Sequence, residues 1–208
     1  MLDVEGFILV GGGSRRMGSD KAQLMFGART GVERIAGELQ SHTGRVRLVG
    51  ARAEHHVAGF ENVPDLFEHW GALGGIHSAL AAARAQWVII VACDLPLVTS
   101  ELFAKLRQLT NSTFDAVVPI QADGRPQPLC AIYRREGTLN ESESLIATGE
   151  HTPRALLARI RTRWVEFREL TDLPGSAHFF LNVNTPADYE EALQILERQN
   201  RVAGEVIS

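Results

Sequence analysis

A glycine-rich and basic stretch follows the first apolar run of the chain, residues 7–10. Three consecutive glycines occupy positions 11–13, and Arg16 and Lys21 come after them. Glycine has no Cβ, so the backbone can take positive φ angles and bring its N–H groups close to a bulky anion. The arginine and the lysine supply cationic donors that neutralise phosphate charge. These residue types in this order predict a loop that binds a nucleoside triphosphate.

Two common phosphate-binding patterns do not fit this loop. In a Walker A loop the lysine follows the second conserved glycine directly, whereas Ser19 follows Gly18 here. A Rossmann pattern counted from Gly11 would place its last glycine at Arg16. A surface turn of glycine and arginine after a core strand is the other interpretation of the stretch. The residues downstream favour the phosphate loop.

Two aspartates follow other predicted strands. Asp94 comes after the apolar run 87–92 and Cys93, so it emerges where a buried strand meets solvent. A single carboxylate beside a triphosphate is a suitable anchor for Mg²⁺, with water and phosphate oxygens completing the shell. Asp65 follows a shorter strand and can accept hydrogen bonds from a base or a ribose. An isolated aspartate in that position is more often a turn residue, and both interpretations stay open.

Two amides near the end of the chain complete the set. Asn182 and Asn184 flank Val183, so strand alternation would turn both amides to one face and the valine to the other. These amides can bind a polar ligand or satisfy the backbone at Thr185, where a helix is predicted to begin. The sequence alone favours neither role.

Apolar periodicity predicts the elements that must position these residues. Strands are expected at 7–10, 46–49, 61–65, 87–92, 115–120, 129–133, 161–168 and 179–184, and helices at 30–39, 73–85 and 101–109 and from 153 and 186 onward. Strands that alternate with helices form βαβ units with a parallel sheet, in which ligands bind at the carboxyl ends of the strands. We expect an α/β fold with a mostly parallel sheet flanked by helices, an antiparallel C-terminal part, and a single domain over 1–208.

Composition narrows the class of protein. The 208 residues are 45% hydrophobic and 22% charged, and their net charge of −4 is that of an ordinary globular protein. A sequence pI near 6.0 argues against wholesale nucleic-acid binding. No apolar run reaches the roughly 20 residues of a membrane span, so we expect a cytoplasmic protein. The two cysteines, Cys93 and Cys130, are predicted to be free thiols.

Four segments together resemble the MobA family, the molybdenum cofactor guanylyltransferases. They are LVGGGSRRMGSDK at 9–21, GALGGI at 71–76, CDLP at 93–96 and NVNTP at 182–186. Their order is that of the family, and the resemblance covers about residues 5 to 195. It implies a Rossmann-like nucleotidyltransferase that transfers GMP from GTP to the molybdenum-bound molybdopterin. Pyrophosphate would be released and the guanine dinucleotide cofactor formed.

The resemblance also implies roles for individual residues. Those implied for nucleotide binding are Leu9, Val10, Gly11, Gly12, Lys21, Asp65 and Asp94. The implied catalytic residues are Lys21, Asp94 and Arg16, with Lys21 stabilising phosphate charge in the transition state and Asp94 holding Mg²⁺. Asn182 and Asn184 would border the pterin side. Implied partners are GTP, molybdopterin, molybdenum insertion proteins and recipient molybdoenzymes, with no nucleic acid and no membrane.

Three positions depart from the family pattern, and other functions stay open. Val10 replaces an alanine, Gly50 an asparagine and Ala72 a proline. The nearest alternative is a cytidylyltransferase acting on the same pterin, or another nucleotidyltransferase that acts on a small-molecule phosphate such as a sugar phosphate. A GTP-binding module without turnover is the alternative of a different class. The glycine pair at 11–12 favours guanine, and the presence of both Lys21 and Asp94 favours turnover.

Overall fold

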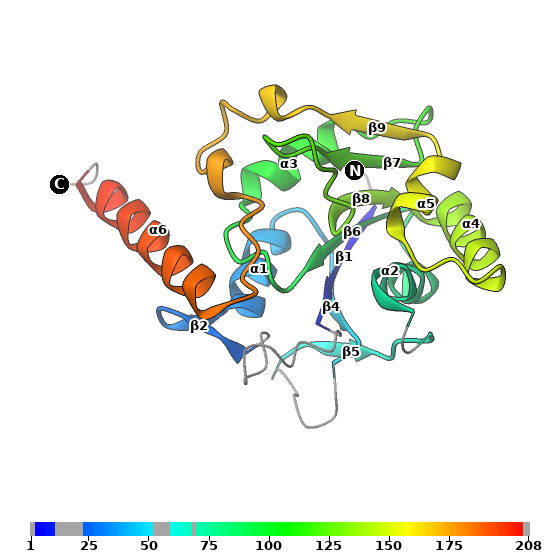
Figure 1. Ribbon diagram of the computed structural model, residues 1–208, viewed down its shortest axis with the longest axis horizontal. Coiled ribbons are helices and arrows are strands. Elements are labelled where there is room, and N and C mark those ends of the chain that lie inside the picture. The colour runs from blue at the N-terminus through cyan, green and yellow to red at the C-terminus, as the bar shows by residue number, and fades with distance from the viewer. Residues whose placement is uncertain (1–2, 11–22, 52–58, 68–69, 206–208) are drawn as a thin grey trace.

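The computed structural model describes residues 3–10, 23–51, 59–67 and 70–205. Its described strands form a seven-stranded sheet in the order β5-β4-β1-β6-β8-β7-β9 (Figure 1). In that order the strands span Glu61–Val63, Val46–Val49, Val4–Leu9, Trp87–Ala92, Cys130–Arg134, Ala116–Pro119 and Thr162–Val165. Strand β8 is antiparallel to both of its neighbours, and all other pairings in the sheet are parallel. A separate hairpin pairs β2, Met25–Phe26, with β3, Arg29–Thr30.

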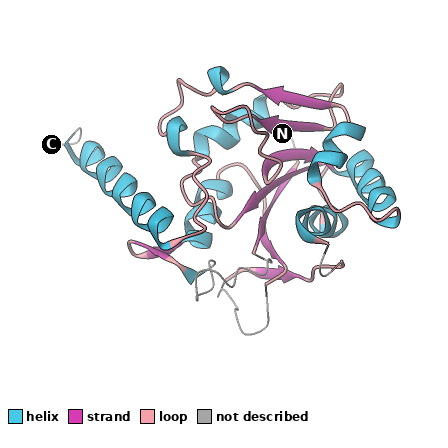
Figure 2. Cartoon of the chain, viewed as in Figure 1, coloured by secondary structure: helices cyan, strands magenta, loops and turns pink. Residues whose placement is uncertain are grey.

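Helices cover both faces of the sheet (Figures 1 and 2). Their bounds are Gly31–Gln40 for α1, Gly71–Ala82 for α2, Ser100–Gln108 for α3, Arg135–Ala147 for α4, Pro153–Arg159 for α5 and Pro186–Glu205 for α6. Two short 3-10 helices, η4 at Phe167–Glu169 and η5 at Ser176–His178, lie between β9 and α6. None of the described helices combines the length and apolar character that a membrane span requires.

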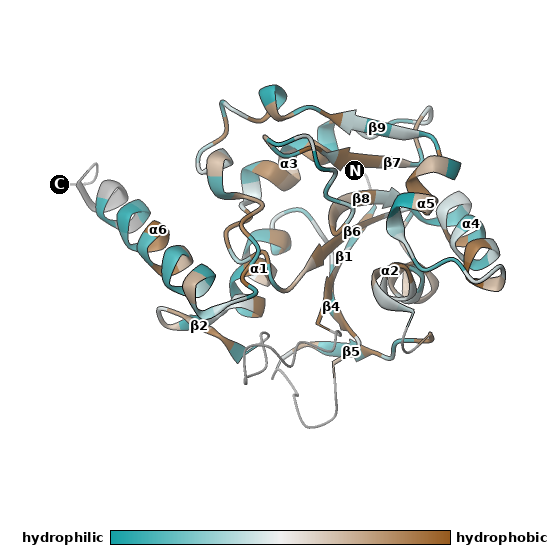
Figure 3. Cartoon of the chain, in the orientation of Figure 1, coloured by the Kyte–Doolittle hydropathy of each residue, from teal (hydrophilic) through white to brown (hydrophobic). Residues whose placement is uncertain are grey.

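Strand alternation divides the core into two layers. Phe7 and Ile90 face the side covered by α2, α4 and α5, whereas Ile8 and Ile89 face α1 and α3. All six residues of β6 are buried, which is why its sequence is a continuous apolar run rather than an alternating one. The apolar colouring of the central strands is plain in Figure 3. Both layers pack on the same sheet, and a third, smaller cluster joins α6 to Phe26 and Val183.

Most of the expected elements are confirmed. The strands 46–49 and 87–92 have the expected bounds, and β7 and β8 pair in antiparallel fashion as expected. Strands β5 and β9 lie at the two edges of the sheet. Thr152 caps α5 through its side chain, with Pro153 in the first turn. The fold class predicted from the sequence is therefore correct.

One expectation about the elements needs correction, and two elements have no counterpart among the sequence predictions. Residues 179–184 form no strand, because after η5 this segment crosses the edge of the sheet instead of pairing along a neighbour. Helix α4 lacks the apolar periodicity that predicts a helix, because the polar residues Thr138 and Ser142 occupy two of its buried positions. The β2–β3 hairpin has strands of only two residues each, too short for a periodic signal.

Cys93 and Cys130 are not joined by a disulfide, as expected. Cys130 is fully buried in β8, and the loss of solvation raises the pKa of its thiol. Cys93 is only half-buried at the end of β6. Neither thiol forms a disulfide, and among the described residues no group of three or more His, Cys, Asp and Glu side chains is placed to hold a metal ion.

Candidate functional site

The ends of β1 and β6 lie side by side at the carboxyl edge of the sheet. Leu9 pairs with Ala92 across the two parallel strands, and the Cys93 N–H donates to the Leu9 carbonyl at 3.1 Å. The Val10 N–H donates to the carbonyl oxygen of Val49, at the end of β4, at 3.0 Å. The residue that enters the predicted phosphate loop is thus next to the turn that carries Asp94. Gly11, Gly12, Arg16 and Lys21 themselves lie outside the described residues.

Asp94 sits in a turn that also receives the C-terminal part of the chain. The Leu95 N–H closes the turn on the Ala92 carbonyl at 3.2 Å, and carboxylate oxygen Oδ1 of Asp94 is shielded from solvent. The Val183 N–H donates to the Asp94 carbonyl oxygen at 2.9 Å. A contact between positions 89 residues apart therefore brings the asparagine segment to Asp94.

The asparagine segment keeps the expected alternation without being a strand. Asn182 and Asn184 are exposed, and Val183 between them is buried. The side chain of Asp188 accepts from the N–H groups of Asn184 and Thr185 at 2.9 and 2.8 Å, and the Asp188 N–H donates to the Thr185 hydroxyl at 3.2 Å. This reciprocal capping satisfies the start of α6. The start of α6 is therefore capped by Thr185 and Asp188.

The acidic partner of this cap, Asp188, is what our sequence reasoning missed. A Ser or Thr followed three residues later by an acidic residue is a recognised signal for a helix start. Thr185 and Asp188 match it. The role of the two asparagine amides in binding a ligand stays a prediction.

Asp65 is held in place by a local network. Its Oδ1 atom accepts from the Phe67 N–H at 3.1 Å and lies 3.1 Å from the hydroxyl of buried Ser78. That hydroxyl also lies 2.9 Å from the Gly74 carbonyl oxygen, and it accepts from the Leu66 N–H at 2.9 Å. The other carboxylate oxygen of Asp65 makes no hydrogen bond to a described residue. One carboxylate oxygen of Asp65 thus fixes the turn.

Two glycines of α2 allow this helix to approach the site closely. A Cβ on Gly75 would lie 3.1 Å from a methyl carbon of Leu9, and a Cβ on Gly74 would lie 2.9 Å from the Phe67 carbonyl oxygen. Gly74 and Gly75 belong to the segment GALGG that resembles the family pattern. Their physical role is to let the first turns of α2 pack on the end of β1 and on the turn after Asp65.

Gly50 follows β4 at the same edge of the sheet. Its φ angle is +76°, a value open to glycine and, among side-chain residues, most readily to asparagine and aspartate. Its N–H donates to the Val63 carbonyl at 3.0 Å. The backbone conformation explains why glycine can replace the asparagine of the family pattern here.

The order of the strands sets the dimensions of the site. Asp65 follows β5 and Asp94 follows β6, and β4 and β1 lie between them. Three inter-strand spacings amount to about 14 Å. That span is comparable to the length of an extended nucleotide. The carboxyl edge can accommodate a nucleoside at the β5 side and its phosphates near Asp94.

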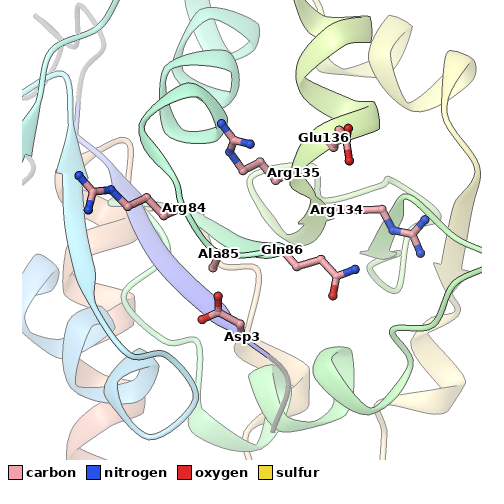
Figure 4. Close-up of a pocket in the computed structure, with 7 residues that line it drawn as sticks. All are labelled: Asp3, Arg84, Ala85, Gln86, Arg134, Arg135 and Glu136. Carbon is pink, nitrogen blue, oxygen red and sulfur yellow. The ribbon is translucent and has the colours of Figure 1, made fainter.

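A hollow of about 440 Å³ lies at the opposite edge of the sheet, where the parallel strands begin (Figure 4). Its lining includes Arg134, Arg84 and Asp3, where β1 begins and β8 ends. Arg134 already donates to the Asn111 carbonyl at 3.0 Å and lies 3.7 Å from Asp115. None of the predicted site residues within the described part of the chain lines this hollow, so we do not assign it to the site.

The fold and the residues at its carboxyl edge define an α/β nucleotide-binding protein. Over residues 6–164 the sequence matches the family described as the MobA-like NTP transferase domain. This chain belongs to that family, a family of nucleotidyltransferases. The resemblance noted from the four sequence segments is confirmed.

Individual relatives agree with this assignment. A probable molybdenum cofactor guanylyltransferase of Pelotomaculum thermopropionicum is 34% identical over 198 residues, 95% of each chain. One of Carboxydothermus hydrogenoformans is 35% identical over 189 residues, covering 90% of this chain and 94% of the relative.

Two solved structures share the fold. Molybdopterin-guanine dinucleotide biosynthesis protein A of Archaeoglobus fulgidus matches with a TM-score of 0.78 at 24% identity, covering 93% of this chain and 99% of its own. A 2-C-methyl-D-erythritol 4-phosphate cytidylyltransferase of Thermus thermophilus matches with a TM-score of 0.67 at 19% identity, over 93% and 98%. Because guanylyl and cytidylyl enzymes share this architecture, the fold alone does not select the nucleotide.

Proposed function

We propose that this protein transfers GMP from GTP to the terminal phosphate of molybdenum-bound molybdopterin. The observation that carries the proposal is the meeting of Asp94 with the segment around Val183, beside the strand that leads into the phosphate loop. The relatives at 34 and 35% identity are named as probable enzymes of this reaction. The product would be the guanine dinucleotide cofactor, released together with pyrophosphate.

In the proposed reaction a phosphate oxygen of the acceptor attacks the α-phosphorus of GTP. The bond from that phosphorus to the bridging oxygen of the β-phosphate breaks, and pyrophosphate leaves. The protein contributes position and charge rather than a covalent intermediate. Gly11 and Gly12 would approach the phosphates through their backbone, and Arg16 and Lys21 would neutralise charge that develops on the leaving group.

The two substrates would bind at opposite ends of the site. Leu9, Val10 and Asp65 would hold the nucleotide at the β1–β4–β5 side, where one carboxylate oxygen of Asp65 fixes its turn. Asn182 and Asn184 would border the acceptor on the other side of Asp94. This arrangement brings the acceptor phosphate to the α-phosphorus at the end of β6.

We further propose that the reaction uses Mg²⁺. Asp94 offers a single carboxylate at the carboxyl edge, which suits an ion whose remaining ligands are phosphate oxygens and water. When bound, Mg²⁺ supplies positive charge at the transferring phosphate. A zinc site takes three or four protein ligands, and the described residues contain no group of three or more His, Cys, Asp and Glu side chains placed to hold a metal, so a single carboxylate completed by phosphate oxygens and water suits Mg²⁺ better.

The remaining expectations belong with this proposal. We treat residues 1–208 as one domain, which the single sheet shared by both core layers supports. We also propose that the protein acts in the cytoplasm, where GTP is available. Molybdenum insertion proteins and recipient molybdoenzymes would then be the partners that deliver the acceptor and take the product.

The decisive experiment measures pyrophosphate release with GTP, CTP, ATP or UTP as donor and molybdopterin as acceptor. We expect release with GTP and Mg²⁺, and little with the other nucleotides. Preferential turnover of CTP would instead assign the protein to the cytidylyl branch. GTP binding without pyrophosphate release would leave only a nucleotide-binding module.

Asp94→Ala tests the metal assignment in the same assay. The variant should lose Mg²⁺-dependent transfer while its circular dichroism spectrum stays that of the wild type. Asp172→Ala, which removes an exposed aspartate after η4, is the matched control and should keep full activity. Transfer by Asp94→Ala at the wild-type rate would remove Asp94 from the metal site.

A further inference from the structure

We propose that Ser78 is a positioning residue for nucleotide binding, because it holds the carboxylate of Asp65 in the orientation in which that carboxylate binds the nucleoside. The inference rests on the proposed function, which assigns Asp65 to the nucleotide. Ser78 lies two residues beyond the segment 71–76, outside the four segments that resemble the family. It therefore adds a residue to the nucleotide end of the site.

Ser78 is a polar residue of α2 with 0% exposure. The helix reaches the turn after β5 because Gly74, one helical turn before Ser78, has no side chain to hold α2 away from the Phe67 carbonyl. The Ser78 hydroxyl is thereby brought into the same turn. A buried hydroxyl is almost always hydrogen-bonded, and the partners of this one indicate its role.

The Ser78 hydroxyl connects α2 to the turn that carries Asp65. Its oxygen accepts from the Leu66 N–H at 2.9 Å and lies 3.1 Å from Oδ1 of Asp65. It also lies 2.9 Å from the carbonyl oxygen of Gly74, a contact that a serine in any helix can make four residues back. A hydroxyl has one proton, so the carbonyl and the carboxylate compete for it. The carboxylate is the stronger acceptor because it is charged, and we assign the proton to Asp65.

Asp65 receives one local and one distant hydrogen bond on the same oxygen. The Phe67 N–H donates at 3.1 Å from two residues away, which is a turn that an aspartate can form by itself. The Ser78 hydroxyl lies 13 residues from Asp65 in the sequence. The local bond fixes Asp65 within its own turn. The bond from Ser78 fixes it relative to α2, and α2 in turn packs on Leu9 through Gly75.

The contribution of this arrangement is that Asp65 is oriented before the nucleotide binds. A carboxylate has about four acceptor positions on its two oxygens, so Asp65 can accept donors of a nucleoside while Oδ1 keeps both of its bonds. Immobilising a mobile side chain during binding lowers affinity, and a side chain that is already fixed avoids this loss. Ser78 thus acts on the nucleotide through Asp65, and its removal should weaken binding without slowing the chemical step.

The preceding residue of α2 makes a comparable buried contact in another direction. The Nδ1 atom of buried His77 lies 3.0 Å from the hydroxyl of Ser142 in α4. Ser142 is fully buried too, and its hydroxyl donates to the Leu139 carbonyl at 2.7 Å. Ser142→Ala removes the same atom as Ser78→Ala from an equally buried position. It is therefore the matched control for the loss of a buried hydroxyl.

The test compares Ser78→Ala, Asp65→Ala, the double variant and Ser142→Ala in the full-length protein. GTP affinity is measured by calorimetry with the acceptor absent, and kinetic constants by pyrophosphate release. Ser78→Ala should weaken GTP binding and raise the KM for GTP by about 2- to 10-fold, with kcat and the KM for molybdopterin unchanged. Asp65→Ala should weaken GTP binding on the order of 10- to 100-fold. Ser142→Ala should keep the wild-type affinity.

The double variant distinguishes a positioning role from a merely structural one. If Ser78 acts through Asp65, then Ser78→Ala should cause no further loss of GTP affinity once residue 65 is alanine. Should Ser78→Ala not fold, Ser78→Cys keeps a side chain of similar size with a weaker donor. That variant should show a smaller loss of GTP affinity, which again disappears in the Asp65→Ala background.

Three outcomes would overturn the assignment. They are wild-type GTP affinity in Ser78→Ala, the same loss from Ser78→Ala with and without Asp65, and an equal loss in Ser142→Ala. Transfer from CTP instead of GTP would refute the proposed function alone, since weaker CTP binding by Ser78→Ala would still support Ser78. A wild-type protein that binds neither nucleotide would overturn both.

Discussion

Alanine at Gly74 and alanine at Gly37 should change stability in opposite directions. Both glycines lie inside helices, Gly74 in α2 and Gly37 in α1, where replacing glycine by alanine ordinarily stabilises by about 1 kcal/mol. At Gly37 the nearest atom to the added methyl group is an Arg29 guanidinium nitrogen at 3.6 Å, an ordinary contact with a flexible side chain. At Gly74 the methyl group would lie 2.9 Å from the Phe67 carbonyl oxygen.

The contact at Gly74 decides the sign. A backbone oxygen in a packed turn cannot move aside as a side-chain end can, and overpacking of this kind costs about 1–3 kcal/mol. After the helical gain of about 1 kcal/mol, Gly74→Ala should destabilise by up to about 2 kcal/mol. For a chain of this size the melting temperature should fall by up to about 8 °C, while Gly37→Ala should raise it by about 2–4 °C.

Thermal melts and nucleotide binding on the same two variants complete the test. Phe67 donates its N–H to Asp65, so displacing the turn should also weaken GTP binding by Gly74→Ala. Gly37→Ala should bind GTP as the wild type does. Equal stabilisation by both substitutions would show that α2 does not press on the Phe67 turn, and the close approach argued for this helix would be wrong.

Three further predictions concern charge and hydrogen bonding. Lys21→Ala should lower kcat by on the order of 10²–10³ with a smaller effect on GTP binding, and a rise in KM alone would make Lys21 a binding residue only. Replacing Asn182 and Asn184 together by alanine should weaken acceptor binding by roughly 0.5–1.5 kcal/mol for each lost hydrogen bond, whereas weaker GTP binding by calorimetry with an unchanged melt would put them on the nucleotide side. Side-chain hydrogen bonds from Arg161 lower the pKa of Asp115. The stability that this gives is present above the ordinary carboxyl pKa and is lost as the pH falls through the pKa of the folded state. In urea melts the wild type should therefore be more stable than Asp115→Asn near neutral pH, and this difference should vanish in strong acid. A difference that persists in strong acid would contradict the prediction.

Sequence patterns were sufficient for the elements whose signal is local. The run 87–92 is apolar throughout because both faces of β6 are covered, and its bounds could be read directly. Proline after a capping threonine fixed the start of α5 in the same way. Helix α4 could not be predicted from the sequence, because its core face carries hydroxyl side chains that only the packed structure shows to be buried.

The candidate site shows the same division. The glycine loop, Asp94 and the two asparagines are visible in the sequence because their residue types fit phosphate, metal and amide chemistry. The alternation of buried Val183 with its two polar neighbours is also visible in the sequence, where it predicts a strand. Burial of one side chain between two exposed ones needs no ladder of backbone hydrogen bonds, so the alternation survives while the strand does not.

What the sequence determined by itself is therefore the kind of chemistry and the class of fold, since both depend on residue type and short-range period. Only the tertiary structure decided which residues meet. The hydrogen bond from the Val183 N–H to the Asp94 carbonyl and the approach of Gly75 to Leu9 both join positions far apart in the sequence. Such contacts depend on strand order and helix packing, which no local pattern of residues encodes.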